Sequence, residues 1–163
     1  MGKQWSRGKT SRHLTLVLPR SEKGCSFSTE LGLAYIATVG EDGGPRLHPL
    51  SPVLSKGRLF VFILPKSPKK RDLLRDGRFA LQTFPPASVE FRNAGEEFYI
   101  TGTAELVTDP EARAAVLRDA QQHVGDDEAL FELNIQTVMH SVWIPAKMGG
   151  LRPVRRKWIA PTG

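Results

Sequence analysis

Short apolar runs separated by turn sequences form the central part of the chain. Three of these runs cover residues 34–39, 47–54 and 59–64. Asp-Gly-Gly-Pro follows the first run, and Ser-Lys-Gly follows the second. Because Asp-Gly supplies the positive φ angles that a tight hairpin requires, this pattern predicts two consecutive antiparallel hairpins.

Alternating apolar segments predict further strands on both sides of these hairpins. They cover residues 13–18, 78–84, 97–107 and 135–144. Gly102, in the middle of the 97–107 segment, indicates a β-bulge or a close approach of two backbones. The apolar outer face of the 59–64 strand, together with Trp143, would be exposed in a monomer, so the pattern predicts a homodimer.

Helical patterns are few and short. One helix is predicted from Ser67, a second over residues 111–123, and a third after Gly125 through Leu133; residues 155–159 are expected to form a short tail. The pattern therefore predicts a mainly β (α+β) fold with six or seven mostly antiparallel strands and two or three short helices. A closed or partly closed β-barrel is expected, because closure removes exposed strand edges.

The predicted helix at Ser67 begins with an unfavourable charge pattern. Ser67 suits the N-cap and Pro68 suits the first helical position, but the residues that follow are Lys69, Lys70 and Arg71. Cations at the positive end of a helix dipole are each unfavourable by roughly 0.3–1 kcal/mol. A bound anion would reverse this effect, so the pattern indicates an anion site; a solvated basic turn is the alternative.

Composition and charge narrow the classes of protein that the chain can represent. The 163 residues fit a single domain over 13–163, preceded by a flexible basic arm over 1–12. The net charge is +6, of which the first 20 residues carry +5, so the rest does not form a basic nucleic-acid surface. Cys25 is the single cysteine and excludes an intrachain disulfide. No apolar run reaches the roughly 20 residues of a membrane span and no signal peptide is recognisable, so a cytoplasmic location is expected.

Several of these segments, in this order, resemble the FMN-binding split-barrel superfamily, the pyridoxamine 5′-phosphate oxidase-like proteins. The segments are LAYIATV at 33–39 with Asp42-Gly43, Pro45-Arg46, Ser67-Pro68-Lys69 with Leu73, Asp76 and Ala80-Leu81, and YITGTAE at 99–105. The resemblance covers roughly residues 30–160. It implies a split β-barrel, usually a homodimer in which two subunits build each site.

The resemblance also implies a set of cofactor-binding residues. A strand arginine and the serine and basic residues at the helix start would hold the flavin phosphate, here Arg46, Ser67, Lys69 and Lys70. Backbone of two strands would meet the edge of the isoalloxazine ring, here at Leu47, His48, Pro49, Leu50 and Ser51 and at Phe62 and Ile63. Glu97, Trp143 and Arg155 fall at or near further cofactor-facing positions. No side chain is expected to act as a catalytic acid or base, since the cofactor carries the chemistry.

Three departures from the family pattern bear on the activity. Pro68 stands where the oxidase usually has a second arginine, Glu97 where it has a glutamine, and Ser51 where it has a substrate-phosphate lysine. Oxidation of pyridoxamine phosphate is therefore not expected. The resemblance favours an FMN-dependent oxidoreductase that transfers hydride to a small substrate. An F420-dependent reductase, or a non-catalytic protein that binds flavin, haem or a vitamer, is the alternative.

Two histidines, His48 and His140, lie on predicted strands. His48 lies on the proposed cofactor strand, where it could face either the ligand or the core. His48 and His140 lack the fixed spacing of a metal motif, so haem ligation is the less favoured reading and no metal site is predicted.

Overall fold

The computed structural model describes residues 14–17, 26–29, 33–83, 96–120 and 122–161. The basic arm over 1–12 and Cys25 lie outside the described residues, so the expectations about them stay predictions.

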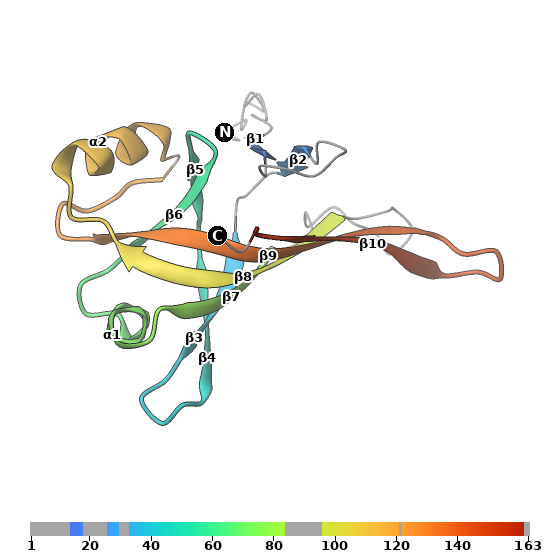
Figure 1. Ribbon diagram of the computed structural model, residues 1–163, viewed down its shortest axis with the longest axis horizontal. Helices are drawn as coiled ribbons and strands as arrows, with labels where there is room; N and C mark the ends of the chain where they lie inside the picture. The colour runs from blue at the N-terminus through green and yellow to red at the C-terminus, as the bar shows by residue number, and fades with distance from the viewer. Residues whose placement is uncertain (1–13, 18–25, 30–32, 84–95, 121, 162–163) are drawn as a thin grey trace, which may run out of the picture.

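Ten strands and two helices make up the described parts of the chain (Figure 1). β1 (Leu14–Val17) and β2 (Ser26–Thr29) pair with each other as a two-stranded sheet. The other eight strands form one antiparallel sheet in the order β4-β3-β7-β8-β9-β6-β5, with β10 paired to β9. Their bounds are β3 Ala34–Val39, β4 Pro45–Leu50, β5 Val53–Ser55, β6 Arg58–Ile63, β7 Arg78–Thr83, β8 Glu96–Leu106, β9 Ala129–Pro145 and β10 Leu151–Ile159; the helices are α1 Pro68–Arg75 and α2 Pro110–Asp119. The predicted mainly β fold with few helices is confirmed, with more strands than expected.

The two ends of the sheet order, β4 and β5, are consecutive in the sequence. Only Ser51 and Pro52 separate them, so a bend of the chain carries it from one end of the order to the other. The predicted single run over 47–54 is therefore two strands, of which β4 pairs with β3 and β5 pairs with β6. Pro52 lacks the N–H that a continuous ladder would need, which explains why the strand is interrupted there.

The strand β6 is buried on both faces. Leu59, Val61 and Ile63 belong to the main core, whereas Phe60 and Phe62 pack in a second cluster with Val53, Val116 and Leu130. Val116 is the buried residue of α2, which thus covers the second face of β6. The prediction that the outer apolar face of this strand is exposed in a monomer is therefore wrong, because α2 of the same chain covers that face.

The segment predicted as a third helix is the start of the longest strand. β9 runs from Ala129 to Pro145. Its first residues, Ala129 to Leu133, pair with β6, and its later residues pair with β10. Ala, Leu and Glu favour helix locally, but pairing between β6 and β8 overrides that preference. The expected short tail is likewise part of β10, which completes a long hairpin with β9.

Gly102 marks the irregular point of the β8–β9 ladder. The register shifts between Thr101 and Gly102. A Cβ atom at Gly102 would lie 2.0 Å from the backbone oxygen of Asn134. The sequence-based expectation of a bulge or close backbone approach is confirmed, and both features are present.

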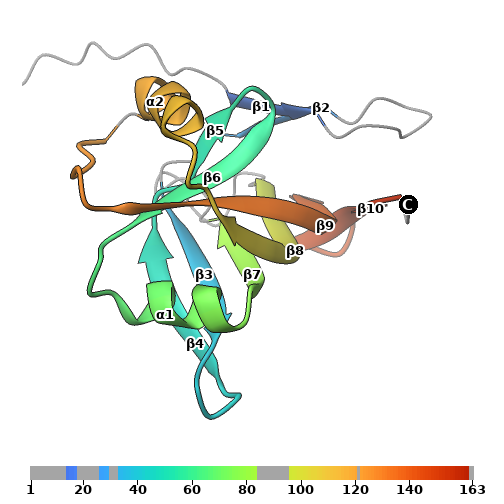
Figure 2. The same cartoon turned by 60° about the vertical axis from the view of Figure 1, so that its left-hand side comes forward.

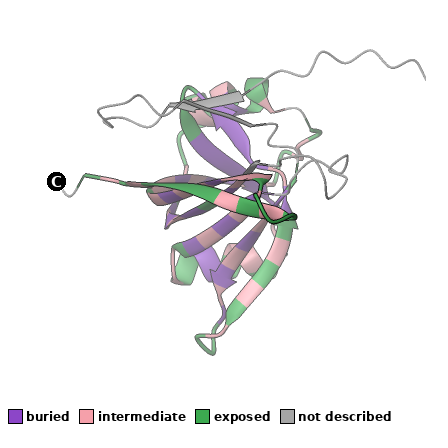
Figure 3. Cartoon of the chain, turned by 90° about the vertical axis from the view of Figure 1, so that its right-hand side faces the viewer, coloured by how far each residue is buried: buried purple, intermediate pink, exposed green. Residues whose placement is uncertain are grey.

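Among the described residues, neither helix is long or apolar enough to cross a membrane. Exposed and half-buried residues make up β10 and most of β4, whereas buried residues recur at every second position along β3 and β7 (Figure 3).

Candidate functional site

The helix α1 lies beside the β3–β4 hairpin (Figure 2): Lys69, in its first turn, contacts Pro49 of β4, and Arg75, at its end, contacts Val39 of β3. In the antiparallel ladder, Thr38 pairs with Arg46 and Ile36 pairs with His48. Thr38 and Ile36 are buried, so Arg46 and His48 lie on the inner face of β4 with them. Leu47 and Pro49 lie on the opposite face and are exposed. The side chain of His48 therefore shares a face with Arg46 and lies opposite buried Ile36, and its contact with a ligand stays a prediction.

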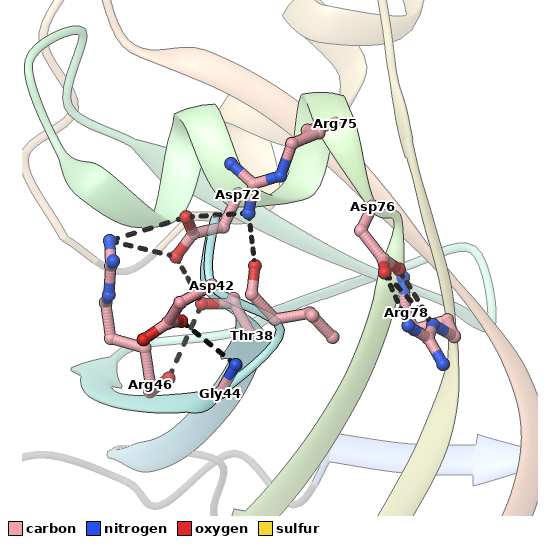
Figure 4. A network of polar contacts seen from close by, with 9 residues as sticks. Thr38, Asp42, Gly44, Arg46, Asp72, Arg75, Asp76 and Arg78 are labelled. Carbon is pink, nitrogen blue, oxygen red and sulfur yellow. Dashed lines mark hydrogen bonds and ion pairs between the residues drawn. The ribbon is translucent and has the colours of Figure 1, made fainter.

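A buried carboxylate connects α1 to this face (Figure 4). The side chain of Asp72 is 2% exposed and accepts a 2.8 Å hydrogen bond from Thr38 Oγ1. Arg46 Nη1 lies 3.3 Å from Asp72 Oδ2, and Arg75 Nη2 lies 3.4 Å from Oδ1. Arg75 also donates to the backbone oxygen of Val39 at 2.6 Å. Two arginines and one hydroxyl thus satisfy a carboxylate that could not be buried unpaired.

Lys69, in the first turn of α1, adds a cation next to β4. Its Nζ donates to the backbone oxygen of Pro49 at 3.1 Å, which fastens the first turn of α1 to β4. Desolvation lowers the pKa of Lys69. We call Arg46, His48, Lys69 and Asp72 the α1–β4 cluster.

His48 is the unsatisfied member of the α1–β4 cluster. Its Nε2 is buried and has no hydrogen-bond partner within the described part of the chain. Desolvation lowers the pKa of His48, the positive charges of Lys69 and Arg46 lower it further, and Asp72 acts in the opposite direction. Burial and the nearby cations therefore favour the neutral form of the imidazole.

The His48 environment predicts a pH-dependent stability. Because the folded pKa lies below the ordinary value of 6.5, the unfolded chain binds a proton at this residue more readily below that pH. Stability should fall as the pH falls from 6.5 toward the lowered pKa. Thermal melts between about pH 7.5 and 5.5 should show a smaller loss for His48→Gln than for the wild type. An identical pH dependence in both proteins would contradict this assignment.

The starts of the two helices differ in how they are capped. Ser67 occupies the N-cap of α1, but its side chain makes no capping hydrogen bond and no acid lies in the first turn. Asp109 caps α2 by accepting from Glu111 N and Ala112 N, and Glu111 adds an acid there. The start of α1 therefore carries cations and lacks the side-chain capping bond for which Ser67 is suited.

This difference predicts unequal effects of two matched substitutions on the empty protein. Asp109→Ala should lower the free energy of unfolding by about 1 kcal/mol, because it removes two cap hydrogen bonds. Ser67→Ala should change it by less than about 0.5 kcal/mol, since no such bond exists to lose. Urea unfolding of both variants measures the difference, and equal losses would argue against an uncommitted Ser67 hydroxyl.

The remaining residues expected around the flavin ring lie at several places. Leu50 is buried on the inner face of β4 opposite Ala34, and the backbone oxygen of Ser51 accepts from Gln122. Phe62 and Ile63 are buried in the two core clusters, so only their backbone could meet a ligand. Lys70 is half-buried in the first turn of α1.

Glu97, Trp143 and Arg155 lie on a distant part of the sheet. Glu97, Ser141 and Arg155 are register partners across β8, β9 and β10. In the sheet order, β3 and β7 separate β4 from β8, which corresponds to about 14 Å. Glu97 also shares a face with exposed Tyr99, opposite to buried Phe98. A single chain therefore does not bring these residues to the α1–β4 cluster.

The residues that organise the α1–β4 cluster do not stand out in the sequence. Asp72, Thr38 and Arg75 were not predicted as site residues, although Asp72 stands three positions from both Lys69 and Arg75 in a run of cations. An acid at that helical spacing was the available signal. The described residues contain no group of three or more His, Cys, Asp or Glu able to hold a metal ion.

Comparisons with known proteins agree with this fold. The chain is 22% identical to a haem-binding protein from Mycobacterium smegmatis, with a TM-score of 0.57 over 67% of this chain and 48% of that one. It is 14% identical to a NimC/NimA family protein from Clostridium acetobutylicum, with a TM-score of 0.52 over 76% of this chain and 86% of that one. It is 17% identical to HupZ of Group A Streptococcus, with a TM-score of 0.53 over 67% of this chain and 89% of that one. These likenesses concern the fold alone.

The chain spans about half of the length of the haem-binding protein. No curated protein matches the sequence. The family described as pyridoxamine 5′-phosphate oxidase matches residues 25–141, which is most of the chain. The protein therefore belongs to the pyridoxamine 5′-phosphate oxidase-like family of split-barrel proteins.

Proposed function

We propose that this protein binds FMN through the α1–β4 cluster and acts as a flavin-dependent oxidoreductase on a small substrate. The observation that carries the proposal is the group of polar side chains on α1 and on the adjacent strand β4. Arg46 and Lys69 supply cations, Ser67 has a hydroxyl without a capping bond, and His48 has an unpartnered ring nitrogen. Guanidinium, ammonium and hydroxyl groups beside a helix N-terminus fit a phosphate monoester.

When bound, FMN would supply the hydride chemistry, as cofactors do in general. The residues of this chain would bind and orient it. Arg46, Ser67 and Lys69 would hold the phosphate, with Lys70 beside them. Backbone groups from Leu47 to Ser51 and at Phe62 and Ile63 would meet the ring. F420-dependent reduction is the alternative within the same family.

A homodimer would account for the residues that one chain keeps apart. The α1–β4 cluster and the group formed by Glu97, Trp143 and Arg155 lie on separate parts of the sheet. In the family that the chain belongs to, two subunits usually build each site. We propose that the second group of residues reaches the flavin from a second subunit.

The dimer makes a prediction of its own. Light scattering at micromolar concentration should give about twice the 18.1 kDa of one chain. Arg155→Ala should then weaken FMN binding although Arg155 lies far from Lys69 in its own chain. A mass of one chain in the presence of FMN would contradict the shared site.

FMN titration and steady turnover test the proposed function in sequence. FMN should bind with a dissociation constant in the micromolar range or below, and riboflavin should bind more weakly because it lacks the phosphate. The FMN-loaded protein should oxidise a reduced nicotinamide steadily in the presence of an electron acceptor. Binding without turnover would favour a non-catalytic flavin-binding protein, and equal affinities for FMN and riboflavin would contradict the phosphate site.

Haem binding is a second candidate, and His48 is the observation that favours it. A neutral imidazole with a buried, unpartnered nitrogen is a suitable iron ligand. Arg46 and Lys69 would then meet the haem carboxylates. A haem titration of the wild type and of His48→Ala tests this candidate. A Soret shift that disappears in the variant, and that FMN does not compete away, would favour haem over flavin.

A further inference from the structure

We infer that Asp72 is a positioning residue for Arg46, and that it serves the phosphate site without touching the ligand. This inference rests on the proposed function and deepens it. The side chain of Asp72 is buried, with 2% of its surface exposed. A carboxylate so covered can act on a ligand only through its neighbours.

The position of Arg46 leaves its side chain partly exposed, so a contact is required to hold its guanidinium in one orientation. It lies on β4, at one end of the strand order of the sheet, and its side chain is 40% exposed. A long side chain at such a place loses rotamer entropy when a ligand fixes it. The contacts to Asp72, at 3.3 and 3.4 Å, hold the guanidinium before any ligand arrives.

The contact leaves most of the guanidinium available. Only Nη1 of Arg46 contacts the Asp72 carboxylate among the described residues, so Nε and Nη2 keep their donors. These donors can meet a phosphate while Nη1 stays on Asp72. Asp72 thus holds the guanidinium of Arg46 through Nη1, while Nε and Nη2 can donate to a ligand (Figure 4).

The negative charge of Asp72 is offset before it can repel a phosphate. Arg75 lies 3.4 Å from Oδ1, and Thr38 donates to Oδ2 at 2.8 Å. Arg75 is itself held by the backbone oxygen of Val39. The Asp72–Arg75 pair is therefore close to neutral, and the positioning of Arg46 outweighs the repulsion from the carboxylate.

A double-mutant cycle on ligand affinity tests this inference. FMN and riboflavin are titrated into the wild type, Asp72→Asn, Arg46→Ala and the double variant. Asp72→Asn should weaken FMN binding about fivefold and leave riboflavin unchanged, and in the Arg46→Ala background it should add less than about twofold. Asp76→Asn is the matched control, because it breaks the Asp76–Arg78 pair at the other end of α1 and should change neither affinity.

A second measurement needs no ligand. The Nε–Hε NMR signal of Arg46, assigned by its loss in Arg46→Lys, should be sharp and resolved in the empty wild type and averaged in Asp72→Asn. Should FMN fail to bind the wild type, the proposed function fails, while this signal still decides whether Asp72 orders Arg46. Three results would each overturn the inference. The first is an unchanged Arg46 signal in Asp72→Asn, and the second is tighter FMN binding by that variant. The third is a double variant whose loss of FMN affinity equals the product of the two single losses, because the two residues would then act independently.

Thermal melts show whether Asp72→Asn remains folded. If it does not, Thr38→Val replaces it, since that change keeps the side-chain shape and removes the hydroxyl that orients the carboxylate. It should broaden the Arg46 signal and weaken FMN binding about twofold, again without effect on riboflavin. An unchanged signal together with unchanged FMN affinity would overturn the inference in this arm.

Discussion

Lys69→Ala should weaken FMN binding by about tenfold or more and leave riboflavin binding nearly unchanged. Each charge-assisted contact to a phosphate contributes roughly 1.5–3 kcal/mol. Riboflavin lacks the phosphate, so its binding does not depend on this contact. In combination with Arg46→Ala the loss should exceed about a hundredfold. Titration calorimetry with both ligands measures these differences.

Arg71→Ala is the matched control for Lys69→Ala. Arg71 stands two positions further along α1, is exposed, and forms no ion pair within the described residues. Its removal changes the net charge equally, so any general electrostatic effect on FMN appears in both variants. A similar loss in both variants, or equal losses for FMN and riboflavin, would remove Lys69 from the phosphate site.

The empty Lys69→Ala protein should keep its stability. Lys69 is partly desolvated, and within the described residues its side chain donates one hydrogen bond, to the backbone oxygen of Pro49. Removing a cation from the first turn of α1 also relieves an unfavourable interaction with the helix dipole. A strongly lowered melting temperature would instead make Lys69 a structural residue of the β4–α1 contact.

Gly102→Ala should strongly destabilise the protein. The added Cβ would lie 2.0 Å from the backbone oxygen of Asn134 and 3.0 Å from its carbonyl carbon. Neither backbone atom can move without opening the β8–β9 ladder, so a loss of about 3 kcal/mol or more is expected. For a chain of this length the melting temperature should fall by about 6 °C or more.

Thr103→Ala is the control on the same strand. Thr103 is half-buried beside Gly102, and its side chain makes no hydrogen bond in the described structure. Its truncation should cost less than about 1 kcal/mol. A Gly102→Ala protein as stable as the Thr103→Ala protein would show that the bulge can widen, and that the close approach is not essential.

Local sequence patterns predicted most of the strands and the start of α1. Asp-Gly and Ser-Lys-Gly lie near the two hairpin turns, and apolar residues alternate along β3, β7 and β8. Each of these patterns involves only a few consecutive residues. The cationic first turn of α1 could also be predicted from the sequence, because the helix dipole acts mainly within one turn. The family was identified from the order of these same segments, and the match over residues 25–141 bears it out.

The predictions that failed concern segments whose structure depends on distant partners. Residues 129–133 have helix-favouring composition but pair with β6 as strand β9. The apolar residues of β6 would have been exposed had α2 not covered them. Neither partner can be read from the residues themselves, since pairing and packing join positions far apart in the sequence.

The sequence by itself determined the strand-rich class of this protein, the family, and a basic helix start that would favour an anion. Only the tertiary structure decided that His48 faces inward beside Arg46, and that Glu97, Trp143 and Arg155 lie elsewhere. It alone revealed Asp72, which is 26 residues from Arg46 and 34 from Thr38 along the chain. The physical reason is that a charge pattern acts within one helical turn, whereas a buried carboxylate is stable only where the fold assembles its partners.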